Sequence, residues 1–429
     1  MAWNFHHYYT NRTEGLIGKL RLNDDDENKL KGLREIVRQR TKHVFEEAKA
    51  IAKEVKKCQL SQESVQMMLA NTKLRYLSED DRRQVAMLLY DMDDEARDEF
   101  LNLSPRFWTQ GSFQYDTLNR PFHPGQEMDI DDGTYMPMPI FESEPKIGHT
   151  LLLLLVDSSL KSLEAENDGW IFQVKQTCGR IKIPREKTHI DVPMYAIPKD
   201  QFLQKQLALE ALSARSDSAM NKSYIDFHDS YEVDSEHVNL ALRDGPQKWV
   251  NSDPKIVEDW FNRSCNRIGK SLRLVCRFMK AWRDAQWEVG GPSSISLMAA
   301  TVNILDRVSY DKTDLGETIK VVAQHLPGEF AKGIASPDNT DDKLLFPAQS
   351  EHGPREQDIM SRLEELSVIL YEAECASSKQ SALDTINRAF GRRVTDCNLI
   401  VSAPAAPAFK DEPESASSYT KISSTMTSG

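Results

Sequence analysis

A change in hydrophobic patterning near Pro254 constrains the fold more than any other feature of the sequence. Before it, three β-prone runs lie close together at 170–178, 180–183 and 189–197, and segment 107–140 is typical of a strand, a loop and a second strand. After it, apolar residues recur almost throughout at three- and four-residue spacing. We therefore predict an α+β fold with a mixed front half and a helical back half.

Helical periodicity is clearest in a long amphipathic segment from Leu30 to Val55, which follows the acidic run Asp24–Glu27. Acids before a helix and lysines near its end fit the helix dipole. We interpret Arg34, Arg38 and Arg40 on this helix as a solvated face. One continuous helical face is predicted over 256–282, and a second helix follows at 294–308 after a Gly-Gly-Pro break. Further helices are predicted at 80–103, 151–163, 315–326, 356–374 and 380–390.

These patterns divide the chain into three parts. Residues 1–245 form a mixed domain that includes the long N-terminal helix, with a polar stretch at 200–245 predicted as a small helix and a long surface loop. Residues 246–402 form a helical domain. Residues 403–429 contain Pro, Ala, Ser, Thr and Glu with little to bury, and we predict a disordered tail.

Charge and composition exclude several classes of protein. The formal net charge of -12 argues against a nucleic-acid template as the main partner. No apolar run approaches the roughly 20 residues of a membrane span, and the N-terminus lacks the features of a signal peptide. The six cysteines are scattered without CxxC spacing. A cytoplasmic protein with reduced thiols and no membrane contact is expected.

The candidate chemistry begins at a Gly-Ser pair, Gly111-Ser112, followed by Asp129 and Asp131. Residues two apart on a strand share a face, so the two carboxylates stand side by side with Ile130 buried opposite. Close carboxylates repel each other, and a divalent cation relieves the repulsion. Asp191, in another β-prone run, is the best third carboxylate for a two-metal site.

Other readings of these residues fail or are weaker. An EF-hand counted from Asp129 would need Glu at position twelve, where Ile140 stands. No His or Cys cluster has zinc-ligand spacing, no GxxxxGK[ST] loop is present, and Ser112 lacks the GxSxG context of a hydrolase nucleophile. His123 and His189 are interpreted as loop or packing residues. An Asp-x-Asp pair alone is more often a surface feature.

The order Gly-Ser, Asp-x-Asp, strand Asp resembles the polymerase-β nucleotidyltransferase superfamily. A longer resemblance is carried by QGSFQYDTLNRPFHPGQEMDIDDGTYMP, QTCGRIKI, KTHIDVPMYAIPKD and GGPSSISLMAATVNILD. With these segments the chain is similar, over nearly its whole length, to the cGAS/DncV-like nucleotidyltransferases of CBASS antiphage defence. The resemblance implies a polymerase-β-like nucleotidyltransferase core in residues 1–245.

The resemblance also implies an activity and its residues. ATP and GTP would be joined into 3′,3′-cyclic GMP-AMP, a second messenger, with release of pyrophosphate. Asp129, Asp131 and Asp191 would hold two Mg²⁺ ions, with Mn²⁺ as a possible substitute. The positions that would contact the nucleotides are Gln110, Gly111, Ser112, Tyr115, Arg180, Lys280, Ser294 and Asp341, the last facing guanine.

The tail carries a separate prediction. It ends in Gly429, whose unhindered carboxylate suits conjugation to target lysines by an E1–E2-like partner, as the resemblance implies. Two alternatives to the cyclic product stay open. One is a nucleotidyltransferase that extends RNA or makes linear oligonucleotides, and the other is a catalytically silent scaffold.

Overall fold

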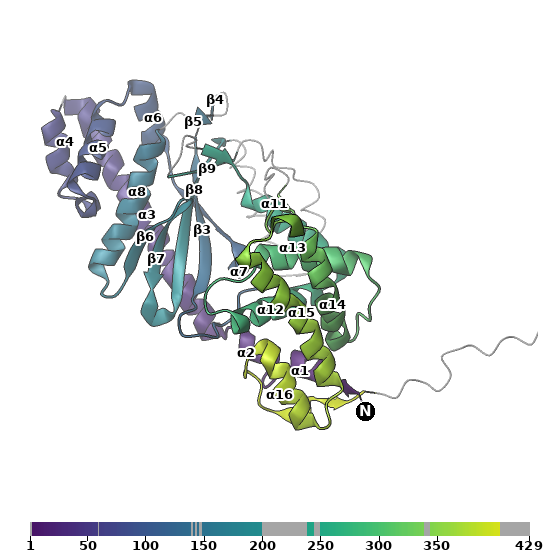
Figure 1. Ribbon diagram of the computed structural model, residues 1–429. Coiled ribbons are helices and arrows are strands. Elements are labelled where there is room, and N and C mark those ends of the chain that lie inside the picture. The colour runs from purple at the N-terminus through teal and green to yellow at the C-terminus, as the bar shows by residue number, and fades with distance from the viewer. Residues whose placement is uncertain are drawn as a thin grey trace, which may run out of the picture.

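The computed structural model describes residues 2–58, 60–138, 140–141, 144–145, 148–199, 238–243, 249–338 and 344–403. Within them, a sheet flanked by helices lies beside a largely helical region (Figure 1). This arrangement confirms the predicted α+β fold. Most of the polar stretch at 200–245, Asp341 and the tail from residue 404 lie outside the described residues.

The central sheet contains strands from both sides of the polar stretch. Its main path runs β10-β9-β8-β3-β2, and β7 joins β8 and β6. Strands β3 and β8 are parallel, and their other neighbours are antiparallel. The strands are β2 Arg106–Gln110, β3 Met128–Pro137, β6 Ile171–Val174, β7 Cys178–Ile183, β8 Thr188–Ile197, β9 Asn239–Ala241 and β10 Trp249–Asn251. Two short pairs, β1 Trp3–Asn4 with β11 Val401–Ser402 and β4 Ile140–Phe141 with β5 Glu144–Pro145, lie outside this sheet.

Helices α3 (Asp24–Cys58) and α8 (His149–Glu166) pack together beside the sheet (Figure 1). Fully buried Ile130, Ile181 and Ile190 belong to the same apolar cluster as residues of these two helices. Burial of this face from water stabilises the layer at roughly 25 cal/mol per Å² of apolar surface. The remaining elements of this part are α4 Gln62–Leu69, η1 Lys73–Tyr76, α5 Glu79–Tyr90, α6 Asp94–Asn102, α7 Gly111–Gln114 and η2 Pro184–Glu186.

The single helix predicted over 80–103 is wrong, because α5 and α6 are separate. Asp93 accepts a hydrogen bond from the backbone N–H of Ala96 at 2.7 Å and so caps the start of α6. The buried Arg97 guanidinium donates to the carbonyl oxygens of Leu89 and Met92, which holds the turn in place.

The helical region consists of α11 Pro254–Ile268, α12 Ser271–Gln286, α13 Ser294–Arg307, α14 Leu315–Ala331, η4 Gln349–Glu351, α15 Pro354–Glu374, α16 Lys379–Phe390 and η5 Cys397–Leu399. The predicted continuous helix over 256–282 is divided at Gly269, whose φ of +126° no helix accommodates. The apolar pattern continues on both sides of the break because α11 and α12 contribute to one core. The other predicted helices of this region are confirmed.

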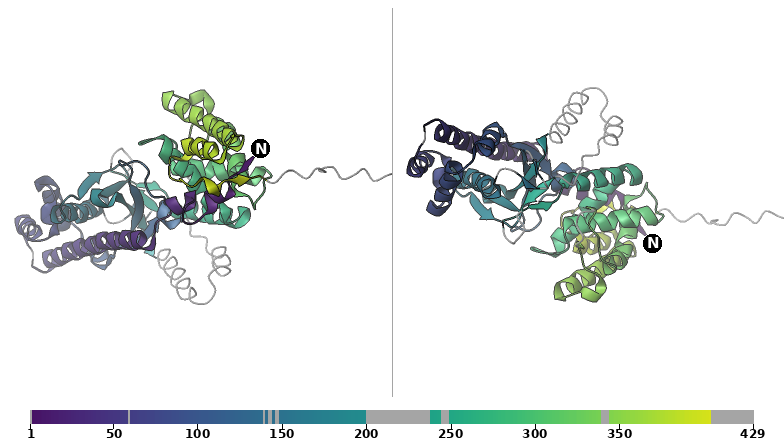
Figure 2. Two further views of the ribbon diagram at one scale, coloured as in Figure 1. Left: turned by 90° about the horizontal axis from the view of Figure 1, so that it is seen from below. Right: turned by 90° about the horizontal axis from the view of Figure 1, so that it is seen from above.

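The first 20 residues pack with the helical region, whereas the sequence division placed all of 1–245 in one domain. Helices α1 (His6–Thr10) and α2 (Leu16–Leu20) contribute to the same core as α12 and α14. Strand β1 pairs with β11, and Ala403 N–H donates to Ala2 O at 2.8 Å. The N-terminus therefore lies at the helical end of the molecule, as Figure 2 shows from two further directions.

Tyr9 provides a test of this packing. Its buried ring contacts Phe278 at 5.1 Å and Phe390 at 5.7 Å between ring centroids. Tyr9→Ala is expected to lower the free energy of unfolding by about 3–5 kcal/mol, as for other buried aromatic side chains. Chemical denaturation measures the change. Ile36→Ala, on an exposed position of α3, is the control and should stay within about 0.5 kcal/mol.

The structure shows the state of the cysteines and the hydropathy of the helices. All six cysteines lie among the described residues and are free, with Cys58 and Cys375 exposed. Among the described residues, no helix has both the length and the hydropathy that crossing a membrane requires.

Candidate active site

A cavity of about 590 Å³ lies between the sheet and the helical region. Strand and turn residues form one wall, and α12 and α13 form the other. Its lining includes Gln110, Gly111, Ser112, Tyr115, Asp129, Asp131, His189, Lys280, Arg283 and Ser294. The two parts of the fold thus meet over a cavity large enough for small phosphorylated ligands.

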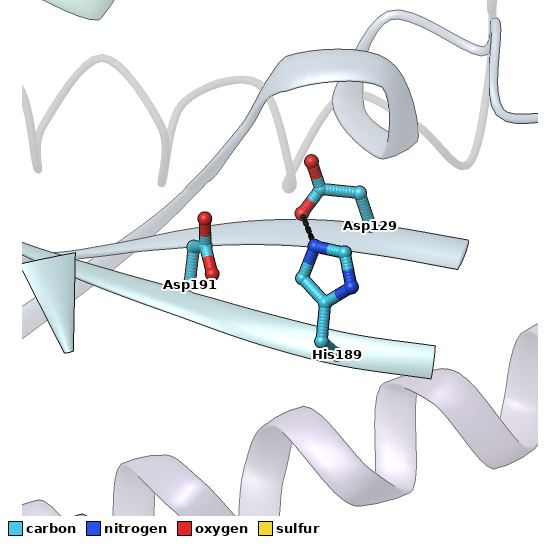
Figure 3. A group of neighbouring side chains, drawn as sticks. All are labelled: Asp129, His189 and Asp191. Atoms are coloured by element: carbon cyan, nitrogen blue, oxygen red, sulfur yellow. Dashed lines mark ion pairs between the residues drawn. The ribbon is translucent and has the colours of Figure 1, made fainter. Parts of the chain in front are cut away.

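Strands β3 and β8 place the carboxylates together. In their parallel register Asp129 lies opposite His189 and Asp131 lies opposite Asp191. Ile130 and Ile190, between them, are also paired and are fully buried on the other face. The apolar pair packs into the core, so the polar residues face away from it. Figure 3 shows the Asp129, His189 and Asp191 side chains on one side of the two strands.

Asp131 carries the strongest electrostatic perturbation of this group. Burial, together with the charges of Asp129 and Asp191, raises the pKa of its carboxyl group to about 7. Its carboxylate lies against Gly111, where an added methyl group would overlap Asp131 Oδ2. Gly111, with φ +65°, is the first residue of the short helix α7, which therefore begins next to Asp131.

Two basic side chains, Arg180 and His189, contact the other carboxylates. Arg180 donates to both oxygens of Asp191, at 2.6 Å from Nε and 2.7 Å from Nη2. His189 Nε2 lies 2.9 Å from Asp129 Oδ1. Burial lowers the pKa of the imidazole, but the contact with Asp129 outweighs it and the pKa lies above its usual value.

The interpretation of His189 as a packing residue is therefore wrong, since it contacts Asp129. It stands two residues before Asp191 on the same strand, so strand alternation was a signal for its position. His123 is a loop residue, with Nε2 3.4 Å from Ala285 O.

The solvated face predicted on α3 is also wrong for Arg38 and Arg40. Arg38 Nε donates to Asp132 Oδ2 at 2.7 Å, and the Asp132 side chain is only 1% exposed. Arg40 donates to Ser162 Oγ at 2.8 Å and pairs with Glu166. Arg34 donates to Thr109 Oγ1 at 2.7 Å. These contacts join α3 to β2, to α8 and to β3, the strand that carries Asp131.

Six of the eight residues predicted to contact nucleotides line the cavity. Gln110, Gly111, Ser112, Tyr115, Lys280 and Ser294 all line the cavity. Buried Lys280 donates to Thr117 O at 2.7 Å, and burial lowers its pKa to about 7. Ser294 Oγ accepts from Arg283 Nη1 at 2.8 Å. Arg180 reaches the site through Asp191, and Asp341 lies outside the described residues.

Sequence reasoning missed Gln126 and Arg283, which also line the cavity. Gln126 Nε2 donates to Asp284 O and Trp287 O, both at 2.8 Å, which joins the loop before β3 to the end of α12. The only sequence signal for Gln126 was its place in a Gly- and Pro-containing loop.

The residues present fit a divalent metal ion. One ligand atom each from Asp129, His189 and Asp191 lies within 4.8 Å of the others. Burial, followed by the charges of Asp129 and Asp191, raises the pKa of Asp131, so an added positive charge here would stabilise its ionised form. Oxygen donors of this kind bind hard divalent cations, which relieve that repulsion.

The carboxylate crowding predicts a pH dependence for the metal-free protein. Because the folded-state pKa of Asp131 is raised from 3.8 to about 7, the folded state holds this proton more tightly than the unfolded state. Its stabilising effect is complete below pH 4 and is lost as pH rises through 7. Asp131→Asn should therefore melt above the wild type at pH 8, with a gap that shrinks toward pH 5. Thermal unfolding in a chelator measures this, and a gap that is constant with pH would contradict it.

Three aspartates on paired strands, with a Gly-Ser turn beside them and a cavity that separates the sheet from a helical region, define a nucleotidyltransferase. Residues 105–195 match the family described as cyclic GMP-AMP synthase DncV-like, nucleotidyltransferase domain, and residues 269–403 match cyclic GMP-AMP synthase, C-terminal domain. The chain belongs to the family of DncV-like cyclic GMP-AMP synthases.

Individual relatives align over the full chain. It is 68% identical to the cyclic GMP-AMP synthase of Vibrio cholerae serotype O1 and 60% identical to one from Escherichia coli, each over 100% of both chains. A crystal structure of the Vibrio cholerae enzyme with the linear intermediate 5′ pppA(3′,5′)pG covers 94% of this chain and 100% of that one, with 67% identity and a TM-score of 0.87. A structure of the same enzyme with GTP and 5MTHFGLU2 has the same identity, coverage and TM-score.

Proposed function

We propose that this nucleotidyltransferase joins ATP and GTP into 3′,3′-cyclic GMP-AMP. The observation that carries the proposal is the grouping of Asp129, Asp131 and Asp191 on two paired strands, with Asp129 and Asp131 lining the cavity that the sheet shares with the helical region. The linear intermediate bound by the Vibrio cholerae relative supports a two-step reaction through a 3′–5′ linkage. The 68% identity, over the full length of both chains, to the Vibrio cholerae cyclic GMP-AMP synthase supports the same product here.

The three aspartates would hold two Mg²⁺ ions, with Mn²⁺ able to replace them. When bound, such ions supply charge neutralisation at the triphosphate and activation of the attacking hydroxyl. The fit rests on the carboxylates of Asp129 and Asp191, whose ligand atoms lie within 4.8 Å of each other, and on the charges of these two residues beside Asp131.

The chain's own residues bind and orient the nucleotides. The Gly111-Ser112 turn allows backbone N–H groups and a hydroxyl to approach a phosphate closely. Gln110, Tyr115, Lys280 and Ser294 line the same cavity, and we assign Arg180 and Asp341 to nucleotide contacts as well, the latter to guanine. Positioning of this kind provides most of the catalysis in phosphoryl and nucleotidyl transfer.

The reaction forms one bond and breaks another in each step. A ribose 3′-hydroxyl loses its proton and attacks the α-phosphorus of the partner triphosphate, and the α–β phosphoanhydride bond breaks to release pyrophosphate. The remaining triphosphate of the linear product is then attacked by the free 3′-hydroxyl at its other end. A second pyrophosphate leaves and the ring closes.

A mass-spectrometric product assay tests the function. Purified protein is incubated with ATP, GTP and Mg²⁺ beside an Asp129→Ala plus Asp131→Ala variant. A cyclic GMP-AMP mass that resists phosphatase and is absent from the variant is the expected result. Phosphatase-sensitive linear products would favour the chain-extending alternative, and no product under any metal condition would favour the scaffold.

We also propose that the enzyme acts in CBASS antiphage defence and that an E1–E2-like partner conjugates Gly429 to target lysines. The partner would adenylate the glycine carboxylate with ATP, releasing pyrophosphate. The acyl group would then pass through a partner thiol, with release of AMP, to a lysine amine as an amide. Support comes from Gly429, whose carboxylate has no side chain beside it to hinder adenylation. Deletion of Gly429 should abolish conjugation by that partner, and unchanged conjugates would exclude this role.

A further inference from the structure

A second row of polar side chains crosses the sheet beside the row that contains Asp131 and Asp191. Asp129 on β3 lies opposite His189 on β8, and His189 lies opposite Lys182 on β7. Glu127 directly precedes β3, two residues before Asp129. The row therefore ends on a carboxylate that the proposed function assigns to the metal.

The contacts along this row are continuous. Lys182 Nζ lies 3.0 Å from Glu127 Oε1, and His189 Nδ1 lies 2.9 Å from Glu127 Oε2. On the other side of the ring, His189 Nε2 lies 2.9 Å from Asp129 Oδ1. Both ring nitrogens thus contact carboxylates, so the ring cannot turn without losing both contacts.

The exposure of these side chains is greatest at Asp129 and least at His189. The Asp129 side chain is 43% exposed, whereas those of Glu127 and His189 are 17% and 10% exposed. An exposed carboxylate is free to rotate unless a neighbour holds it. Here a buried imidazole, itself held by a partly buried carboxylate, contacts one oxygen of Asp129, and Figure 3 shows the other oxygen turned away from the ring.

We propose that Glu127 and His189 are positioning residues, which fix the Asp129 carboxylate in the orientation that metal binding requires. The inference rests on the proposed metal-dependent function. A carboxylate behind a histidine that orients a metal site is a recurrent device, and loss of such an outer residue typically weakens metal affinity by about 10–100-fold. Ion pairs of this burial contribute little net stability, so a purely structural role explains the row less well.

Direct measurement of Mn²⁺ binding tests the positioning role without turnover. The full-length protein is titrated with Mn²⁺ in the absence of nucleotides, and free Mn²⁺ is followed by electron paramagnetic resonance. Glu127→Ala is expected to weaken the affinity by about tenfold or more. Glu127→Gln keeps an oxygen that accepts from Nδ1 and should retain most of the affinity. Asp168→Ala removes an exposed carboxylate paired with Arg185 and is the matched control, expected to bind as the wild type does.

Melting temperatures separate positioning from folding. If Glu127→Ala unfolds, His189→Gln and His189→Ala decide the question, because glutamine retains a donor for Asp129 and alanine does not. Wild-type Mn²⁺ affinity in His189→Ala or in folded Glu127→Ala would overturn the proposal. A loss of affinity in these variants supports it even if the wild type makes no cyclic product, an outcome that would count against the proposed reaction alone.

Discussion

Asp131→Asn is expected to lower the rate of cyclic dinucleotide formation by at least about 10³-fold while the protein stays folded. Asparagine keeps the shape of the side chain but removes the charge at the centre of the carboxylate group, next to Asp129 and Asp191. Transition-state charge stabilisation through a bound metal contributes several kcal/mol, and about 4 kcal/mol corresponds to a thousandfold in rate. Initial rates of pyrophosphate release at saturating Mg²⁺ measure the effect.

The control for this variant is Asp168→Asn, which changes a carboxylate that is 93% exposed and remote from the cavity lining. It should retain the wild-type rate. If Asp131→Asn kept more than about a tenth of the wild-type rate, the carboxylate charge would not be part of the reaction, and the metal assignment would have to exclude Asp131.

Gly111→Ala should reduce the rate by about 10²-fold or more through geometry alone. The added methyl group would overlap Asp131 Oδ2, and the φ of +65° disfavours any side chain at this position. The overlap can be relieved by a shift of the turn or by a rotation of the carboxylate. Both changes displace reacting groups, and a displacement of about 1 Å is enough for a loss of this size. Steady-state kinetics with ATP and GTP measure it.

Gly32→Ala is the matched control, because Gly32 lies within α3 and nothing approaches its added methyl group within 4 Å. It should leave the rate unchanged and stabilise the helix by roughly 0.5–1 kcal/mol. A Gly111→Ala enzyme within twofold of the wild type would show that the turn and the carboxylate move independently of the chemistry.

Local pattern was sufficient for most of the fold. Helix α3 follows from periodicity because it buries one face, whereas β8 follows from a nearly continuous run of buried residues. The break at Gly269 was missed because apolar spacing continues across it into the same core. The docking of residues 3–20 had no local signal, because their partners are hundreds of positions away in the chain.

Local pattern also predicted part of the site. Alternation on β3 placed Asp129 and Asp131 on one face, but their register with β8 depends on pairing residues 60 positions apart, as in Asp129 with His189. Arg38 looked solvated because a helical pattern does not reveal that buried Asp132 lies opposite it. Asp341 and Gly429 lie outside the described residues, so their roles stay predictions.

The docking of the N-terminal segment has a consequence for synthesis of the protein. Trp3 Nε1 donates to Ala376 O across 373 positions of the chain. At about 5–20 residues per second, a ribosome needs roughly 20–75 s to make that length. Tyr9 has neither Phe278 nor Phe390 to pack against until those residues have been synthesised, so its ring is available to chaperones for most of this interval. Tyr9 supports Phe278 on α12, a helix that lines the cavity, so this support is in place only after the chain has been made past that helix.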